Sequence, residues 1–368
     1  MFGVIKRNPV LPIKSIFSLL ASCNARSVVA MDALCSYTGY SRFALYNILK
    51  LLAIDRGSQV LLPAYICDVL LLPCAELGLE PVYYGVTDKF QIDFGTVMIS
   101  PKTKVIITVN YFGLSQDYDA IQSFAGEHDL IWLNDNSHGF ASCHGHRKLE
   151  SFGDFSFTSF RKVLPIINGA RACVNSDRYA SLRHELSKLN RPAATEKKLP
   201  RFMAATLLGH LRYRPMKFPD YSDISVHSDV EIMASRFDRI SASILAATAE
   251  EYVQERRFGL YQAIDSFLQQ KQYEFLDLLT GLLQPGNSPM VFPIAVRDRK
   301  CWKDILRVSR DEGIDIHTWP SMPQEVIEND VFGSATRWQQ LLFLPIHQGL
   351  DAKEYCPRLA RVFDAIEF

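Results

Sequence analysis

Short apolar segments of strand character alternate with segments of helical apolar spacing over the first two thirds of the sequence. Strands that are joined through helices pair in parallel, and a parallel sheet needs helices on both of its faces. The alternation therefore predicts an α/β fold built on a mostly parallel sheet. The predicted strands are 59–63, 80–86, 104–109 and 130–133, and the predicted helices are 42–52, 68–77 and 119–127.

The pattern changes in the last third of the chain. Residues 232–270 have the periodicity and the Ala, Glu and Arg content of a long helix. A smaller α+β unit follows it. We place the junction near residue 235, which gives a large α/β domain (1–235) and a small domain (236–368). In the small domain we predict strands at 290–296, 313–316 and 341–344, and a helix at 300–312.

Composition excludes several classes of function. Lys plus Arg and Asp plus Glu both number 40, so the formal net charge is zero and the charge expected of a nucleic-acid-binding protein is missing. No stretch reaches the length of a membrane span, and we expect no membrane contact. The eight cysteines are scattered without a CxxC pair. This pattern is typical of reduced, mostly buried thiols in a cytoplasmic protein.

Two further segments carry reactive or charged side chains without completing a site. Cys143-His144-Gly145-His146 has metal-binding residue types, but no second cluster complements it, and we interpret it as a solvated loop. The basic segment 191–223 surrounds an apolar stretch at 202–208. It is interpreted as a helix packed on its own protein with lysine and arginine side chains extending to water, with binding to anionic lipid or a partner as the alternative. We therefore expect no metal site.

An aspartate and a lysine stand at the ends of two strand-like segments. Asp135 follows the apolar run 130–133, and Lys162 follows the segment 156–160. Ligands of parallel sheets bind at the carboxyl ends of the strands. Pyridoxal phosphate needs these two groups, because a lysine holds its aldehyde as a Schiff base and a carboxylate keeps its pyridine nitrogen protonated. Alone, Asp135 could be a turn residue, and Lys162 could be a solvated charge beside Arg161.

Five segments, in the same order along the chain, resemble the DegT/StrS type of sugar aminotransferases. This family belongs to the fold-type I pyridoxal phosphate enzymes, which have the aspartate aminotransferase fold. The resemblance implies that fold, a pyridoxal 5'-phosphate cofactor and a homodimer whose subunits share each active site. The segments are TGYSRFAL (38–45), DRGSQVLLPAY (55–65), VNYFG (109–113), NDNSHG (134–139) and LPIH (344–347).

The resemblance also assigns roles to single residues. Lys162 and Asp135 would be catalytic. Ser41 and Arg42 would open a helix whose N–H groups, dipole and cation bind the cofactor phosphate, although Ser41 alone could be an ordinary N-cap. Ser159 would be a further phosphate contact, with Ser156 as the alternative. The other implied cofactor residues are Tyr65, Asn110 and His138, for which a structural histidine is an equal alternative, and the implied substrate residues are His317 and Trp319.

The function implied is transfer of an amino group, from glutamate, to a nucleotide-linked keto-sugar in polysaccharide or glycan biosynthesis. A lysine at position 162 favours transamination, because a dehydratase branch of the family carries histidine there. Two alternatives stay open: another pyridoxal phosphate enzyme acting at an amino-acid α-carbon, and a degenerate member acting as a scaffold or regulator. The family's glycine-rich run is missing after Lys162, one extra residue precedes this lysine, and Phe237-Asp238-Arg239 lacks the family's asparagine.

Overall fold

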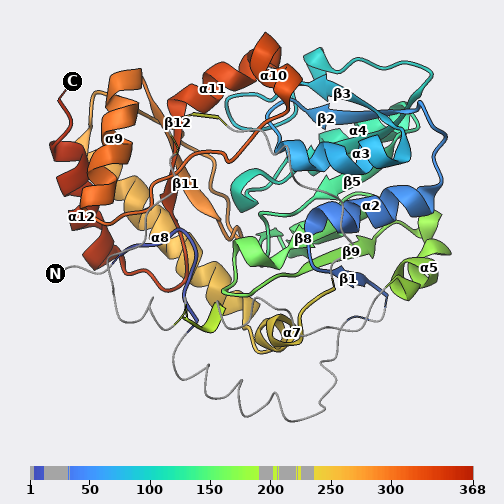
Figure 1. The fold of residues 1–368 in the computed structure, drawn as a ribbon, viewed down its shortest axis with the longest axis horizontal. Coiled ribbons are helices and arrows are strands. Elements are labelled where there is room, and N and C mark those ends of the chain that lie inside the picture. Colours follow the sequence, from blue (N-terminus) through green and yellow to red (C-terminus); the bar gives the residue numbers. More distant parts are fainter. Residues whose placement is uncertain are drawn as a thin grey trace.

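The computed structural model describes residues 4–11, 32, 34–189, 202–204, 206, 221, 223–224 and 236–367. Its largest sheet has seven strands in the order β1-β9-β8-β5-β4-β2-β3 (Figure 1). Neighbours from β8 to β3 pair in parallel, and β9 runs antiparallel to both β8 and β1. The strands are β1 (Ser36–Thr38), β2 (Gln59–Pro63), β3 (Glu80–Tyr84), β4 (Thr103–Val109), β5 (Ile131–Asp135), β8 (Phe155–Ser159) and β9 (Ala170–Val174).

Helices cover both faces of this sheet, which confirms the predicted α/β class. Leu45 and Ile48 of α2 pack with Leu133 and Phe157 in one core cluster. On the opposite face, Ile121 of α4 packs in a second cluster around β4 and β5. The central strands β2 and β4 are rich in apolar residues and buried along almost their whole length, as expected of strands covered on both faces. The helices of this part are α2 (Ser41–Leu52), α3 (Leu71–Leu77), α4 (Tyr118–Glu127) and α5 (Leu182–Lys188).

A smaller antiparallel sheet, β10-β11-β12, forms the C-terminal part of the molecule (Figure 1). The strands predicted at 290–296 and 341–344 are confirmed as β11 and β12. The strand predicted at 313–316 is wrong, because Ile314 makes a single bridge to Ile5 and no ladder follows it. The elements are β10 (Leu276–Leu278), β11 (Val291–Val296), β12 (Leu341–Pro345), α9 (Arg299–Asp311), α10 (Gln324–Asn329), α11 (Ser334–Gln340) and α12 (Ala352–Asp364).

The long helix predicted at 232–270 is two helices, α7 (Arg239–Ala246) and α8 (Glu250–Lys271). Ala249 has an extended backbone between them, and the Thr248 hydroxyl donates a hydrogen bond to the Ile244 carbonyl. Threonine has a lower helix propensity than alanine, and a hydroxyl that bonds the i−4 carbonyl weakens the helical backbone further. The domain junction near residue 235 and most of the basic segment 191–223 lie outside the described residues, so both interpretations stay predictions.

Two other features of the sequence have plain structural outcomes. The strands β6 (Cys143–His144) and β7 (Arg147–Lys148) make residues 143–148 a small hairpin, and residues 144–148 are exposed, as expected of the predicted solvated loop. Gly145 turns it with a φ of 58°. Within the described ranges, no three metal-ligating side chains gather, and none of the helices has the length and apolar character needed to cross a bilayer.

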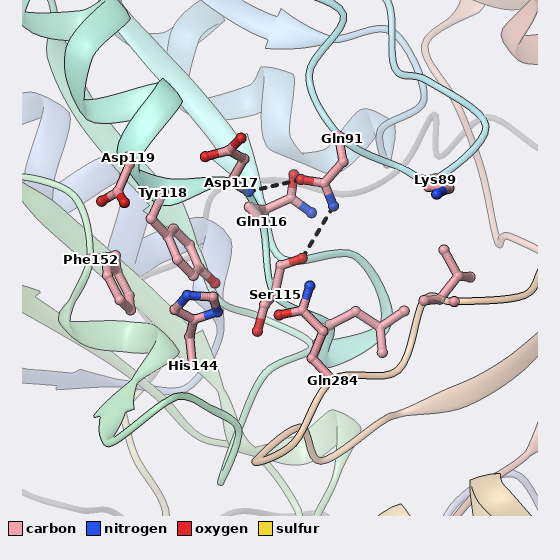
Figure 2. A pocket seen from close by; sticks show the side chains of 13 residues that line it. Lys89, Gln91, Ser115, Gln116, Asp117, Tyr118, Asp119, His144, Phe152 and Gln284 are labelled. Atoms are coloured by element: carbon pink, nitrogen blue, oxygen red, sulfur yellow. Dashed lines mark hydrogen bonds between the residues drawn. The ribbon is translucent and has the colours of Figure 1, made fainter.

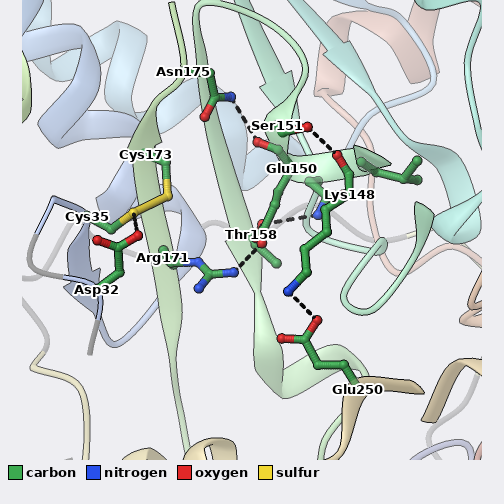
Figure 3. A network of polar contacts seen from close by, with 12 residues as sticks. Asp32, Cys35, Lys148, Glu150, Ser151, Thr158, Arg171, Cys173, Asn175 and Glu250 are labelled. Carbon is green, nitrogen blue, oxygen red and sulfur yellow. Dashed lines mark hydrogen bonds and ion pairs between the residues drawn. A yellow bond between two sulfur atoms is a disulfide. The ribbon is translucent and has the colours of Figure 1, made fainter. Parts of the chain in front are cut away.

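Cys35 and Cys173 form a disulfide, so the expectation of reduced thiols is wrong for this pair (Figure 3). Ser36 pairs with Ala172 across the antiparallel edge of the sheet, which brings Cys35 opposite Cys173 with 4.8 Å between their Cα atoms. The two residues are 138 positions apart, and their spacing alone does not reveal the pairing. The described free cysteines are Cys67, Cys74, Cys143, Cys301 and Cys356.

Reducing this disulfide is expected to lower the free energy of unfolding by about 2–4 kcal/mol, because the link restricts the unfolded chain. Urea unfolding with and without reductant measures the effect. The Cys35→Ser variant is the control, since reductant should not change its stability further. Equal midpoints for the wild type in both conditions would contradict the prediction.

Candidate active site

The strand register brings Asp135 and Lys162 to the same edge of the sheet. Asp135 is the last residue of β5, and it pairs with Phe157 of the parallel strand β8. Lys162 ends the short 3₁₀ turn η5 (Phe160–Lys162) directly after β8. Because β5 and β8 end side by side, the carboxylate and the amine approach each other from neighbouring strands.

A histidine contacts the lysine amine. His138 lies in the loop after β5, and its Nε2 is 2.8 Å from the Lys162 Nζ. Its Nδ1 accepts a hydrogen bond from the Phe112 N–H at 3.2 Å. The ring is parallel to that of Phe112 and meets the Trp319 ring nearly at a right angle. His138 is thus held on several sides, and it touches Lys162 itself.

Burial shifts the pKa values of Asp135 and Lys162 toward their uncharged forms, and the charge of each residue opposes the shift of the other. Burial raises the pKa of Asp135, and the nearby Lys162 charge and hydrogen bonds from Ser137 oppose this shift. Burial lowers the pKa of Lys162, which the Asp135 carboxylate opposes. The lysine nonetheless stays only half-buried. Protein therefore surrounds the amine while part of the side chain is open to solvent.

The N-terminus of α2 lies close to this pair. Tyr40 is the N-cap and Ser41 is the first helical residue, so Ser41 is not an ordinary N-cap. The guanidinium groups of Arg42 and Arg161 lie 4.6 and 5.9 Å from the centre of the Tyr40 ring. Within the described residues, neither arginine forms an ion pair. Free helix N–H groups and two cations make this end of α2 suitable for an anion.

The two candidate serines lie on different faces of β8. Side chains alternate along a strand, so Ser159 shares its face with Phe155 and Phe157, which pack in the same cluster as α2. Ser156 shares its face with Thr158, away from α2. The arrangement favours Ser159 as the serine near the helix N-terminus. Its contact with a phosphate stays a prediction.

Tyr65 and Trp319 close one side of the site with aromatic rings. Their centroids are 5.0 Å apart, and Trp319 also contacts the His138 ring at 5.4 Å. Through Trp319, the loop before α10 therefore packs against the residues around Lys162. Within the described part, the buried Tyr65 hydroxyl and Trp319 indole N–H have no hydrogen-bond partner.

Asn110 is turned away from Asp135. It directly follows Val109, which pairs with Asp135, so its side chain points to the opposite face of the sheet, where α4 lies. Its amide donates to Asn136 and accepts from the Tyr118 hydroxyl. The polar row continues through Thr158 to Glu150, which pairs with Arg171 (Figure 3). This row of hydrogen bonds connects the strand ends on the α4 face of the sheet. A cofactor contact of Asn110 stays a prediction.

His317 has surroundings different from those of Trp319, which contacts the His138 ring. Its ring contacts Tyr221 and Phe343, and its Nδ1 is 3.1 Å from the Asp315 carbonyl oxygen. Burial, assisted by the Arg7 charge, lowers the pKa of His317 to about 3. This histidine is therefore neutral at pH 7, and its role toward a substrate stays a prediction.

Acid is expected to destabilise the fold through His317. In the unfolded chain the histidine takes up a proton at about pH 6.5. In the folded protein it stays neutral until the pH falls to its pKa of about 3. The free energy of unfolding should therefore fall between these limits, by up to about 1.4 kcal/mol per pH unit for one histidine. Unfolding of His317→Gln at several pH values should give a flatter curve. The matched control is His146→Gln, on the exposed hairpin, and equal slopes for the wild type and His317→Gln would contradict the prediction.

A fully buried arginine holds the segment after the lysine. Arg257 of α8 donates to the Val163 carbonyl at 2.9 Å and to the Ile346 and Pro289 carbonyls at 3.0 Å. Burial lowers its pKa to about 9, so it remains a cation at pH 7. It ties Lys162's neighbour to the LPIH segment. Our sequence interpretation missed it, since two consecutive arginines in a helix usually face solvent.

Our sequence interpretation also did not identify Cys67 as a residue near the site. Burial raises the pKa of the Cys67 thiol, and its Sγ lies 3.2 Å from the Ser321 Oγ. The Ser321 hydroxyl in turn donates to the buried Asp68 carboxylate at 2.6 Å. This short chain links the end of β2 to the loop after Trp319. No pattern in the sequence distinguishes Cys67 from the other cysteines.

A separate cavity of about 390 Å³ lies on the α4 side of the strand ends (Figure 2). Most of its polar lining is already hydrogen-bonded, since Gln91 donates to the Ser115 carbonyl and accepts from the Asp117 N–H. Neither Lys162 nor Asp135 lines it. This cavity is therefore not part of the candidate site.

The residues at the sheet edge fit pyridoxal phosphate. The side chain of Lys162 is partly open to solvent, and the carboxylate of Asp135 is buried, with one oxygen bonded to the Ser137 N–H. Two arginines without carboxylate partners in the described part lie at the N-terminus of α2. The orphaned hydroxyl of Tyr65 is a further buried polar group that a bound ligand could satisfy. The donor set therefore matches an aldehyde, a ring nitrogen and a phosphate.

Comparison with known families gives one match over most of the chain. The DegT/DnrJ/EryC1/StrS aminotransferase family matches residues 41–355. Among curated proteins, the chain is similar to the UDP-4-amino-4,6-dideoxy-N-acetyl-beta-L-altrosamine transaminase of Helicobacter pylori, with 29% identity over 188 residues. This match covers 47% of the chain and 49% of the relative. A GDP-perosamine synthase of Vibrio cholerae is 25% identical over 36% of the chain and 38% of the relative. The chain thus spans about half or less of these relatives' length.

Solved structures resemble the fold over nearly its whole length. PseC of Helicobacter pylori, an aminotransferase involved in the biosynthesis of pseudaminic acid, superposes with a TM-score of 0.74 at 19% identity and covers 99% of this chain and 100% of its own. NtdA of Bacillus subtilis with bound cofactor PMP gives a TM-score of 0.70 at 15% identity, over 99% and 86%. At these identities the likeness establishes the fold, which is that of fold-type I.

Proposed function

We propose that this chain, which belongs to the DegT/DnrJ/EryC1/StrS aminotransferase family, is a pyridoxal phosphate-dependent aminotransferase. It moves an amino group from an amino-acid donor, glutamate, to the keto group of a nucleotide-linked sugar. The product serves the biosynthesis of a surface polysaccharide or another glycan. The names of the similar curated proteins, a transaminase of a UDP-linked sugar and a GDP-perosamine synthase, support this substrate class.

One observation carries the proposal. The Lys162 amine, the Asp135 carboxylate and the N-terminal end of α2 with Arg42 lie at one edge of a parallel sheet. Lys162 is half-buried there, and its pKa is lowered by burial. A surface lysine beside Arg161 would show neither property.

Each residue has a task that follows from its position. When bound, pyridoxal phosphate supplies an aldehyde that links to amines and a ring that accepts electrons. Asp135 would accept a hydrogen bond from the ring nitrogen, and its charge would keep that nitrogen protonated. Arg42 and the N–H groups of α2 would hold the phosphate. Lys162 would be the amine that links to the aldehyde and, once free, the base at the substrate carbon. Trp319 excludes water on its side.

Three finer points belong to the same proposal. The glutamate donor and the homodimer with shared active sites rest on the family resemblance. A cytoplasmic location rests on the scattered cysteines, and the Cys35–Cys173 disulfide weighs against it, because cytosolic disulfides are rare. Light scattering of the purified protein tests the dimer, since a monomer would leave the shared site without its second half.

A two-step titration tests the function. Protein loaded with pyridoxal phosphate should convert the cofactor to its amine form on addition of glutamate, and a nucleotide-linked keto-sugar should reverse the change. The absorption spectrum follows both steps. A response to another amino acid without transfer to any keto-sugar would favour a different reaction at the α-carbon. Protein that binds neither cofactor nor donor would favour a scaffold and refute the proposal.

A further inference from the structure

The hydrogen-bonding state of His138 can be deduced from its neighbours. A backbone N–H can only donate, so the bond from the Phe112 N–H shows that Nδ1 carries a lone pair. An imidazolium ring carries protons on both nitrogens, so a ring whose Nδ1 accepts a hydrogen bond is neutral, and burial lowers the pKa of His138 in the same direction. A neutral imidazole has one N–H. The proton of His138 is therefore on Nε2.

The lysine must then be the acceptor of the second bond. His138 Nε2 and Lys162 Nζ are 2.8 Å apart, which is a hydrogen-bond distance. An ammonium group has three donors and no acceptor, so it would face the Nε2–H with another N–H. Only an uncharged amine offers the lone pair that this contact needs. The geometry thus requires Lys162 without its extra proton.

The fold gives the histidine no freedom to reverse this arrangement. Phe112, which supplies the N–H, has a φ of 57°, a backbone region that residues other than glycine rarely adopt. The His138 ring lies parallel to Phe112, with an angle of 8° between their planes, and Trp319 packs against its edge at 5.4 Å. A flipped ring would lose the bond from Phe112.

We propose that the His138 Nε2–H donates a hydrogen bond to the Lys162 amine and thereby holds the lysine side chain uncharged before any cofactor is bound. The histidine is then a catalytic residue that prepares the nucleophile, in addition to lining the cofactor. This inference rests on the proposed function in one respect only: the proposed reaction is what would use the free amine. Each time Lys162 is released from the cofactor, the same contact receives it as a neutral base.

The other charged groups around the amine do not set this state by themselves. Burial is the largest cause that lowers the pKa of Lys162, and Arg161 adds to it, whereas Asp135 and Cys67 act in the opposite direction. His138 supplies a directed bond that only the neutral amine can make. Its removal should therefore move the equilibrium toward the ammonium form.

The test measures Lys162 in protein without cofactor. Competitive labelling with acetic anhydride at a series of pH values, followed by mass spectrometry, gives the titration of Lys162, with the exposed Lys102 in the same digest as a reference. The wild-type Lys162 curve should lie well below the ordinary lysine value of about 10.4. In parallel, ¹⁵N NMR of histidine-labelled protein should show His138 protonated on Nε2 and not on Nδ1.

Two substitutions separate the bond from the charge. His138→Gln keeps an acceptor for Phe112 and a donor for Lys162, so its curve should stay close to the wild type. His138→Glu places an anion at the amine and should raise the titration of Lys162 by about one to three pH units. His144→Gln, on the exposed hairpin, is the matched control, and circular dichroism checks that each variant folds.

Several results would overturn the inference. They are a wild-type Lys162 that titrates like an exposed lysine, a His138 protonated on Nδ1, or a glutamine variant shifted as far as the glutamate variant. The first two need no variant to fold. Because no cofactor is present, these outcomes are independent of the two-step titration that decides the proposed function.

Discussion

The Lys162→Ala variant is expected to lose all borohydride-reducible attachment of pyridoxal phosphate. The lysine amine is the only described amine that stands at 2.8 Å from His138 and interacts with the Asp135 carboxylate. Its removal also takes away the group that moves the proton at the substrate carbon, an effect worth about 10²–10⁴-fold in rate. Mass spectrometry of the reduced, digested protein measures the attachment, and transfer to a keto-sugar measures the rate.

Lys102→Ala is a suitable control, because this lysine is exposed and lies before β4, outside the site. It should keep both the adduct and the rate of the wild type. An adduct that persists in Lys162→Ala would move the covalent site to another lysine. Loss of the adduct in both variants would point to unfolding, which circular dichroism would reveal.

The main parts of the site could be predicted because their order in the chain carries the information. Strands of a parallel sheet end at one edge, so an aspartate after one strand and a lysine after another were expected to meet. The structure places Asp135 at the end of β5 and Lys162 just after β8, as neighbours. The family resemblance added Ser41, Arg42 and Trp319, which also gather around this edge. Local sequence was sufficient for these positions.

Features that depend on register or on distant contacts could not be predicted. Asn110 faces away from Asp135 because β4 pairs with β5 at Val109 and Asp135, and a shift of one residue would have turned it inward. Cys35 meets Cys173 only through the pairing of β1 with β9. Arg257 connects three separate segments only because the fold brings a carbonyl group of each to its guanidinium group. No single stretch of the sequence contains the information that predicts any of these contacts.

The Asp135→Asn variant should separate attachment of the cofactor from turnover. Asparagine keeps an oxygen that can accept the Ser137 N–H, as the Asp135 Oδ1 does at 2.8 Å. It replaces the other oxygen by an NH₂ group, which cannot accept a hydrogen bond from a protonated ring nitrogen. We therefore expect covalent attachment at Lys162 to persist, while the transfer rate falls by about 10²–10³-fold, the loss typical of one preorganised electrostatic contact.

A matched substitution makes this result specific. Asp117→Asn changes another aspartate whose Oδ1 accepts a backbone N–H, that of Ala120 at the start of α4, but it lies outside the site. It should leave attachment and rate unchanged. If Asp135→Asn also kept the full rate, the carboxylate would not act on the ring nitrogen, and the edge of the sheet would lose its second functional group. If it lost attachment as completely as Lys162→Ala, Asp135 would serve to position the amine instead. Only the combination of a retained adduct and a slow transfer assigns the covalent step to Lys162 and the charge on the ring to Asp135.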